Sequence, residues 1–313
     1  MRKIKMKNNK IKNIGEGFER FQKFNKSKNL SEKTIEYYKE SYEIFRKYLS
    51  LNDIFNFNDL NREFIEDYTI YLQEKDLSPN SINTYLRGIR AFLYYMMSNG
   101  WMTSFKINTI KTNRNKPKGY NEKQLKKLLI RPNMNKCTFA YYRNWVIINF
   151  FLDTGIRASS LTYIKIKDLN LEMQEVEIRH TKSRRERTLP LSETMTEILY
   201  DYLEIRNGEL PDYLFPNVYG ERLTRSGLTH AIRSFNKSRD VDKTSIHGFR
   251  HSYSKIFIKN GGTISQLRKI LGHKNIETTD KYINLLISDF KDDYSRLNPL
   301  ESLIERKKSI KFN

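Results

Sequence analysis

One segment of the chain is especially informative about its architecture. It reads Asp153-Thr-Gly-Ile-Arg157-Ala-Ser-Ser-Leu161 and directly follows a helical pattern over Tyr142–Leu152. Three later segments also combine basic residues with histidine, threonine or tyrosine. They are Arg179-His-Thr-Lys182-Ser-Arg-Arg-Glu-Arg-Thr-Leu-Pro190-Leu191, His247-Gly-Phe-Arg250-His251-Ser-Tyr253 and Leu271-Gly-His273-Lys-Asn-Ile-Glu-Thr-Thr-Asp-Lys-Tyr282. Each segment alone is a weak signal, so the information lies in all four occurring in this order.

Together the four segments resemble the arginine box, the strand-hairpin lysine, the H-x-x-R box and the L-G-H…Y box of tyrosine recombinases, the phage integrase family. The spacing of nine positions from His273 to Tyr282 adds to the resemblance, which covers about residues 15–295. It implies a fold that is mainly α with a small antiparallel β-sheet. An N-terminal helical bundle would be the SAM-like, DNA-binding core-binding domain, and a mixed α/β domain would be the tyrosine-recombinase catalytic domain.

The residue types in these segments suit phosphoryl transfer. Transesterification at a phosphodiester needs charge neutralised on the non-bridging oxygens, and planar guanidinium groups do this bidentately. Histidines can hydrogen-bond the same phosphate or take the proton of the nucleophile. The resemblance assigns protonation of the leaving 5′-oxygen to Lys182 and formation of a 3′-phosphotyrosyl ester to Tyr282. The candidate catalytic residues are therefore Arg157, Lys182, His247, Arg250, His273 and Tyr282.

The proposed chemistry requires no cofactor. The tyrosyl ester retains the energy of the phosphodiester, so rejoining needs neither ATP nor a ligase. The arginines supply the charge that a metal ion supplies in other enzymes, so no metal is expected. His247 and His251 are spaced as in a zincin helix, but Gly248 stands where that motif needs glutamate.

One position departs from the family pattern. Three residues after the first arginine the family usually has an acidic residue, and this chain has Ser160. The acid would support the active-site histidine and arginine groups through hydrogen bonds. A serine can hydrogen-bond but carries no charge, so the support of the site differs here.

The first part of the chain reads as a bundle of about four helices. Apolar residues recur at steps of three and four after Ser31, which is placed to cap a helix. Ser78-Pro79 combines a capping serine with proline at the first helical position, and Gly100 can end that helix. A first helix around Phe18 to Phe24 and another from Leu60 to Leu72 complete the bundle.

The remaining boundaries follow from composition. Residues 1–14 form a basic arm, 15–110 the helical core-binding domain, 111–119 a basic linker with Pro117 and Gly119, and 120–295 the catalytic domain. Within the last, a helix begins near Asn121, two short strands around 171–191 form a hairpin, and helical patterns return from Ser192, near 223–238 and from His247 onward. Residues 296–313 form a tail with an apolar stripe, which packs either on its own domain or, as relatives commonly do, on a neighbouring protomer.

The charge points to a polyanionic partner. The formal net charge is +21 over 313 residues, and binding of lysine and arginine to phosphates releases condensed counterions. A single cysteine, Cys137, excludes an intrachain disulfide and favours a cytoplasmic protein, associated here with the bacterial nucleoid. No run of apolar residues is long enough for a membrane span.

Three functions fit these observations. The first is a site-specific recombinase or integrase that acts on double-stranded DNA sites through a Holliday junction, as a dimer on one site and a tetramer in synapsis, with or without accessory DNA-bending or excision factors. The second is a catalytically silent DNA-binding regulator or architectural protein on the same fold. The third is an enzyme that relaxes DNA in the manner of type IB topoisomerases. The complete set of six candidate residues favours the recombinase.

Overall fold

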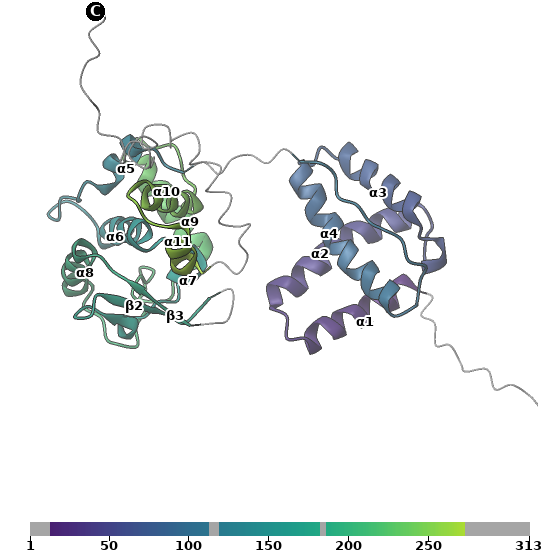
Figure 1. Ribbon diagram of the computed structural model, residues 1–313, viewed down its shortest axis with the longest axis horizontal. Helices are drawn as coiled ribbons and strands as arrows, with labels where there is room; N and C mark the ends of the chain where they lie inside the picture. Colours follow the sequence, from purple (N-terminus) through teal and green to yellow (C-terminus); the bar gives the residue numbers. More distant parts are fainter. Residues whose placement is uncertain (1–12, 113–118, 182–185, 273–313) are drawn as a thin grey trace, which may run out of the picture. The chain divides into compact units, whose positions relative to one another are not determined.

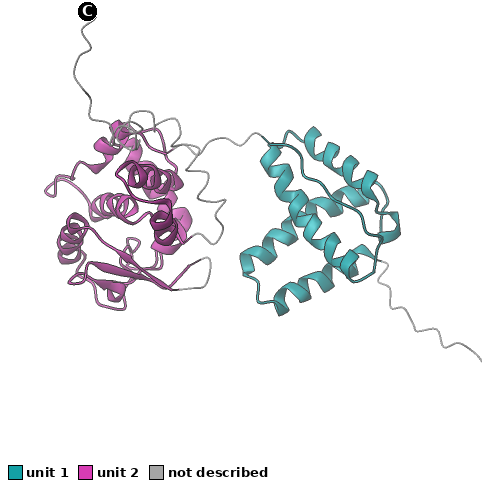
Figure 2. Cartoon of the chain, viewed as in Figure 1, with its two compact units in different colours: residues 1–115 teal, residues 116–313 magenta. Residues whose placement is uncertain are grey.

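The chain divides into two compact units. The computed structural model describes residues 13–112, 119–181 and 186–272. The two units are Met1–Asn115 and Lys116–Asn313, and the division falls within the basic segment 111–119 (Figure 2). Among the described residues, no helix is long and apolar enough to cross a membrane.

The described residues of the first unit form four α-helices, and two of them begin at the capping residues predicted from the sequence, Ser31 and Ser78. Asn13 caps α1, the oxygen of Ser31 accepts from the Thr34 amide at the start of α2, and Ser78 with Pro79 begins α4. Such side-chain acceptors satisfy amides that have no partner inside the helix. The elements are α1 (Ile14–Ser27), α2 (Glu32–Leu51), the 3-10 helix η1 (Phe57–Asp59), α3 (Arg62–Glu74) and α4 (Pro79–Ser98).

Aromatic side chains form the core of this unit. The rings of Phe18 and Tyr42 stack with centroids 3.8 Å apart, and Phe92 meets both rings edge-on. All three side chains are buried. Burial of rings of this size supplies much of the stability of a small bundle, so the unit forms its own hydrophobic core.

The second unit is built around α6, which lies at its centre (Figure 1). This helix packs against α5, α8, α9 and α10, and nearly every residue from Tyr142 to Phe151 is buried. The elements are α5 (Glu122–Leu129), α6 (Phe139–Thr154), α7 (Ala158–Leu161), the 3-10 helix η2 (Ile166–Asp168), β1 (Leu169–Asn170), β2 (Glu175–Ile178), β3 (Arg187–Pro190), α8 (Glu193–Arg206), α9 (Arg225–Lys237), α10 (Ile246–Lys259) and α11 (Ile264–Leu271).

The strands form a three-stranded antiparallel sheet in the order β1-β2-β3. The predicted hairpin is present, with Val176 opposite Leu189 and Ile178 opposite Arg187. The predicted fold class, mainly α with a small antiparallel sheet, is confirmed. The sequence did not predict β1, nor the break between α10 and α11 at Gly261 (φ +90°) and Gly262. A Cβ at Gly262 would lie 2.2 Å from the Phe257 ring, so this turn needs glycine.

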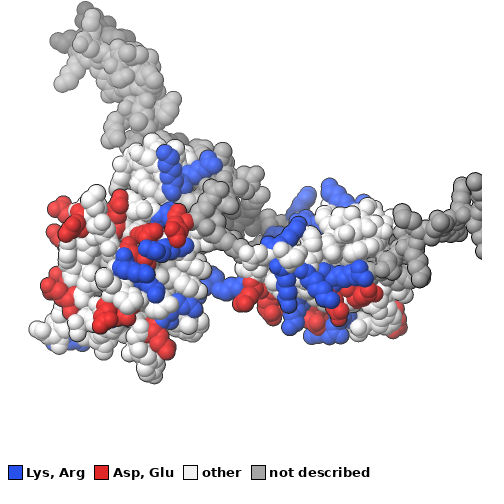
Figure 3. All heavy atoms as spheres, turned by 90° about the horizontal axis from the view of Figure 1, so that it is seen from below, with Lys and Arg blue, Asp and Glu red and all other residues white. Residues whose placement is uncertain are grey.

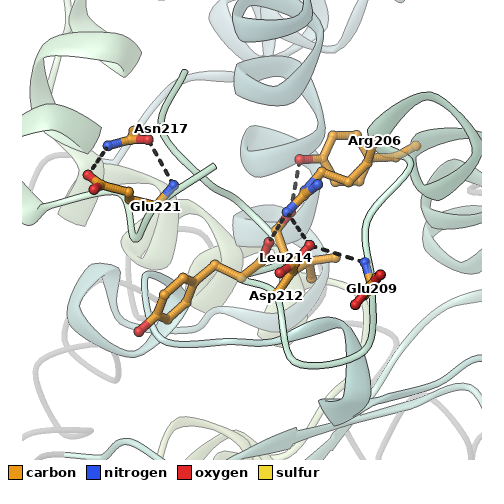
Figure 4. A network of polar contacts seen from close by, with 8 residues as sticks. Arg206, Glu209, Asp212, Leu214, Asn217 and Glu221 are labelled. Atoms are coloured by element: carbon orange, nitrogen blue, oxygen red, sulfur yellow. Dashed lines mark hydrogen bonds and ion pairs between the residues drawn. The ribbon is translucent and has the colours of Figure 1, made fainter. Parts of the chain in front are cut away.

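Polar contacts fix the connection between α8 and α9 (Figure 4). The guanidinium of Arg206 donates to the Asp212 carboxylate at 3.4 Å, and that carboxylate accepts from the Glu209 amide at 3.1 Å. The Asn217 side chain accepts from the Glu221 amide at 3.0 Å and donates to its carboxylate at 3.2 Å. The long loop is thereby held before it enters α9.

The crossing of α2 and α4 yields a prediction about stability. A Cβ at Gly88 would lie 2.3 Å from the Ser41 hydroxyl and 2.5 Å from its Cβ. Gly88→Ala gains about 1 kcal/mol in helix propensity but overpacks the crossing, which costs about 1–3 kcal/mol. We expect the variant to unfold at lower urea concentration than the wild type. The double variant Ser41→Gly/Gly88→Ala, which restores the space, should recover part of the difference. A Gly88→Ala protein more stable than the wild type would contradict this packing.

Candidate active site

Two helices of the second unit end close together at glycines in the left-handed conformation. Gly155 (φ +60°) ends α6, and Gly272 (φ +61°) ends α11. A Cβ at Gly155 would lie 2.4 Å from the Tyr253 ring, and a Cβ at Gly272 would lie 2.5 Å from Nη1 of Arg187. Glycine is therefore required for both conformation and space. The last carbonyls of each helix have no partner within the helix, so they can accept hydrogen bonds from elsewhere.

Arg250 connects the two helix ends. Its Nη1 donates to the Gly155 carbonyl at 2.7 Å and its Nη2 donates to the Leu271 carbonyl at 2.8 Å. The side chain is only 2% exposed. It comes from the first turns of α10, whose start is capped by Ser245. The negative end of a helix dipole favours a cation, so both helices stabilise this guanidinium.

Two further arginines reach the same end of α11. Arg157, which directly precedes α7, donates from Nη1 to the Leu271 carbonyl at 3.3 Å. Arg187, on β3, donates from Nη1 to the Ile270 carbonyl at 2.6 Å. Burial, with a smaller contribution from Arg157, lowers the pKa of Arg187 to about 10. Three arginines from three elements thus converge on two consecutive carbonyl oxygens.

His247 completes this group, which we call the arginine cluster: Arg157, Arg187, His247 and Arg250. The imidazole is accessible to solvent, yet neighbouring protein atoms displace part of its hydration and lower its pKa. The positive charges of Arg250, Arg157 and Arg225 lower it further, in that order. The neutral ring is therefore favoured at neutral pH and can accept a proton. The ring of His251 lies 5.0 Å away, in an edge contact with His247.

The arrangement is suited to binding an anion. A main-chain carbonyl orients a guanidinium but does not cancel its charge, in contrast to a carboxylate. A guanidinium has five N–H donors, more than the one or two that bind the carbonyls here. A phosphate is the anion whose oxygens match such donors bidentately. Within the part of the chain that the structure describes, no cluster of three or more histidine, cysteine, aspartate or glutamate side chains could hold a metal ion.

The structure brings together three of the six predicted residues: Arg157, His247 and Arg250. Lys182, His273 and Tyr282 lie outside the described residues, and their roles stay predictions. Lys182 follows Thr181 directly in the chain, and His273 follows Gly272. Ser160, at the position where the family usually has an acid, is 3% exposed, and its amide donates to the Arg157 carbonyl at 2.9 Å. It therefore lies within the same turn that presents Arg157.

The sequence did not single out Arg187, although a signal was present. Residues alternate between the two faces of a strand, so Arg187 shares a face with Leu189, and its cross-strand partner is Ile178. Both of these neighbours are buried, with exposures of 2% and 1%. An arginine on the buried face of a strand needs acceptors inside the protein, which the end of α11 supplies.

Outside the cluster, positive and negative side chains are intermixed on the described surface of both units in the view of Figure 3. Several arginines outside the cluster are paired with carboxylates, such as Arg46 with Glu43 at 2.8 Å and Arg131 with Asp201 at 2.7 Å. Exposed pairs of this kind add little stability and leave little net charge locally. Arg157, Arg187 and Arg250 differ because each donates to a main-chain carbonyl at the end of α11.

Comparison with known proteins identifies the family. Residues 120–288 match the phage integrase family, and residues 9–113 match the phage integrase SAM-like domain. The first match alone spans more than half of the chain. The chain belongs to the phage integrase family. This confirms the predicted family and enzyme class, a tyrosine-type recombinase, and nothing in the comparisons supports the silent regulator.

Relatives and structural neighbours agree with this membership. Tyrosine recombinase XerD of Listeria monocytogenes is 28% identical over 283 residues, covering 87% of this chain and 94% of that protein. XerD of Staphylococcus haemolyticus is 27% identical over 281 residues, with the same coverages of 87% and 94%.

Two solved structures share the fold at lower identity. The integrase of transposon Tn1549, in complex with transposon right end DNA, has a TM-score of 0.72 at 18% identity and covers 91% of this chain and 99% of that one. A lambda integrase tetramer bound to a Holliday junction has a TM-score of 0.70 at 16% identity and covers 88% of this chain and 78% of that one. At these identities the likeness concerns the fold alone.

The electrostatics of the cluster predict the titration of His247. Its pKa, followed by NMR of the imidazole, should lie below the ordinary value of about 6.5, because lost hydration and nearby arginines disfavour the charged ring. His247→Asn assigns the signal, and Arg225→Gln should raise the pKa by removing one positive charge. Since the unfolded chain binds this proton more readily, the contribution of His247 to stability is present above the unfolded pKa and is lost as the pH falls from there through the lower folded pKa. A pKa above the ordinary value would contradict the described surroundings.

Proposed function

We propose that this chain cuts and rejoins double-stranded DNA with the six residues Arg157, Lys182, His247, Arg250, His273 and Tyr282. The Tyr282 hydroxyl oxygen attacks the scissile phosphorus, and its proton passes to a histidine. The bond from phosphorus to the 5′-oxygen breaks, and that oxygen takes a proton from Lys182. The products are a 3′-phosphotyrosyl ester and a free 5′-hydroxyl. Attack by a 5′-hydroxyl from a second duplex reverses these steps and exchanges strands through a Holliday junction.

The observation that supports this proposal most is the convergence of Arg157, His247 and Arg250 beside the end of α11. In the transition state the non-bridging oxygens gain negative charge, and donors held in advance stabilise it without reorganisation. The lowered pKa of His247 leaves its ring neutral and able to accept the proton of the nucleophile. The arginines supply positive charge at the phosphate, which is the role of divalent metal ions in other phosphoryl-transfer enzymes.

The assembly is proposed by analogy with the structural neighbours. The lambda integrase is seen as a dimer on a core site and as a tetramer on a Holliday junction. For this chain we propose the same sequence, a dimer on one DNA site and a tetramer in synapsis, acting on the nucleoid in the cytoplasm. Accessory DNA-bending or excision factors fit the same scheme.

The two units would share the work of binding one duplex. We propose that the SAM-like domain at 15–110 and the catalytic domain at 120–295 bind the same DNA, connected by the basic linker 111–119. The basic arm at 1–14 would add phosphate contacts. Several such contacts would make the affinity fall steeply with salt concentration.

The tail at 296–313 is proposed to bind a neighbouring protomer. It lies outside the described residues, but its sequence places Leu297, Leu300 and Ile304 on one helical stripe. The second unit has an apolar groove of about 610 Å³ that could bind this helical stripe of a neighbouring protomer. Its lining includes Leu125, Leu129, Leu152, Tyr253, Ile256 and Phe257. A tail seated there could position Tyr282 only when a neighbour is present.

The assignment of Tyr282 as the nucleophile can be tested by removing its hydroxyl oxygen. Tyr282→Phe should leave folding and DNA affinity unchanged and abolish covalent protein–DNA adducts. Wild type and variant are incubated with nicked genomic fragments, which trap the adduct, and run on a denaturing gel. Tyr294→Phe, a change of the same kind twelve positions further on, should keep the adduct. A shifted band from Tyr282→Phe would exclude Tyr282 as the nucleophile, and sequencing the trapped DNA from the wild type identifies the site.

Deletion of the tail tests its role in assembly. Without residues 296–313 the protein should remain folded and bind one half-site, but fill two half-sites without cooperativity. Gel-shift titrations on one-half and two-half sites measure this. A full-length variant with Leu297, Leu300 and Ile304 changed to serine should behave like the deletion, because it removes only the apolar stripe. Unchanged cooperativity in both variants would show that the tail does not bind in trans.

A further inference from the structure

Arg187 joins two parts of the chain that are far apart in sequence. On one side, it belongs to β3 and pairs across the sheet with Ile178. On the other, it donates to the Ile270 carbonyl at 2.6 Å, a contact over 83 positions. The predicted general acid, Lys182, lies in the connection between β2 and β3, and His273 is the residue directly after Gly272. Arg187 therefore links the strand pair that leads to Lys182 with the helix end that leads to His273.

The surrounding residues are arranged to accommodate the contact between Arg187 and the Ile270 carbonyl. Leu189, two positions along β3 on the same face, is 2% exposed, and Ile178 is 1% exposed, so Arg187 extends from a buried strand face. Gly272 has no side chain where a Cβ would lie 2.5 Å from Nη1 of Arg187. The left-handed turn of Gly272 both ends α11 and leaves room for the guanidinium.

The position is also costly for an arginine, which argues for a role beyond stability. Its Nε is buried and has no hydrogen-bond partner among the described residues. Burial and the charge of Arg157 lower its pKa to about 10. An apolar residue of similar length would avoid both penalties on a buried strand face. What it could not do is hold the Ile270 carbonyl.

We propose that Arg187 is a positioning residue, which fixes the β2–β3 strand pair against the end of α11 so that the leaving 5′-oxygen is protonated efficiently. The inference rests on the proposed function, in which Lys182 is the acid. Arg187 is proposed to act through this contact, in which its Nη1 donates to the Ile270 carbonyl while its Nε is buried. Loss of the contact should therefore impair one chemical step more than DNA binding.

The first test needs no DNA and uses amide hydrogen exchange on the full chain. Arg187→Met, and the milder Arg187→Gln, should raise exchange both in the β2–β3 ladder and in the last turn of α11. The matched control is Arg239→Met. Arg239 also donates to carbonyls, those of Lys127 at 3.1 Å and Ile130 at 2.8 Å, but away from the arginine cluster. The control should raise exchange near Lys127 and leave α11 unchanged. An increase on only one side of the Arg187 contact, or on neither, would overturn the proposal.

The second test separates positioning of the acid from general damage. The DNA site identified by sequencing the trapped covalent adduct is prepared as a duplex in which sulfur replaces the scissile 5′-oxygen. A thiolate is a weak base and leaves without a proton, so the acid is not needed. On the oxygen substrate, Arg187→Met should cleave at least about tenfold more slowly than wild type, within the range of general acid catalysis. On the sulfur substrate the cleavage rate of Arg187→Met should return to within about threefold of the wild-type rate. The same recovery is expected of a variant that lacks only the general acid.

The variant Lys182→Ala separates the assignment of Lys182 as the acid from the assignment of Arg187 as its positioning residue. If the sulfur substrate restores Lys182→Ala and Arg187→Met alike, both assignments are supported. If it restores Lys182→Ala but not Arg187→Met, the acid stands and the positioning role of Arg187 is wrong. If it does not restore Lys182→Ala, Lys182 is not the acid; the proposed function then fails in that part, and the positioning of the acid by Arg187 fails with it.

Discussion

The candidate active site depends on the carbonyl end of one short helix. The last turn of α11 presents the Ile270 and Leu271 oxygens, and Arg157, Arg187 and Arg250 all donate to them. Because Gly272 ends the helix in a left-handed turn, these oxygens are left without helical partners and face the arginines. The three side chains come from the start of α7, from β3 and from α10, so one helix end sets the mutual position of three elements.

Neutral acceptors are the important property of this arrangement. A carboxylate would hold a guanidinium more strongly but would cancel the charge that a phosphodiester needs. Carbonyl oxygens at the negative ends of α6 and α11 stabilise Arg250 and carry no formal charge of their own. Lost hydration, and after it the positive charges of the arginines, lowers the pKa of His247, which favours the neutral ring at neutral pH.

Local signals in the sequence predicted much of this fold. Ser31, Ser78 and Asn121 each cap the helix that begins after them, because capping depends on a few neighbouring residues. Resemblance in four short segments predicted Arg157, His247 and Arg250 as one site. The contact between Arg187 and Ile270 could not be predicted in this way, since it joins residues 83 positions apart and depends on the packing of β3 against α11. The short strand β1 and the break at Gly261 were missed because neither has a strong local pattern.

The central claim is that Arg157 and Arg250 activate a phosphodiester for attack by Tyr282. The most direct measurement is mass spectrometry of the covalent protein–DNA adduct after digestion with nuclease and trypsin. The account predicts a nucleotide on the peptide that spans residues 282–291, attached to Tyr282, and a strong loss of this adduct when Arg250 is changed to lysine. A nucleotide attached to any other residue, or an undiminished adduct in Arg250→Lys, would contradict it.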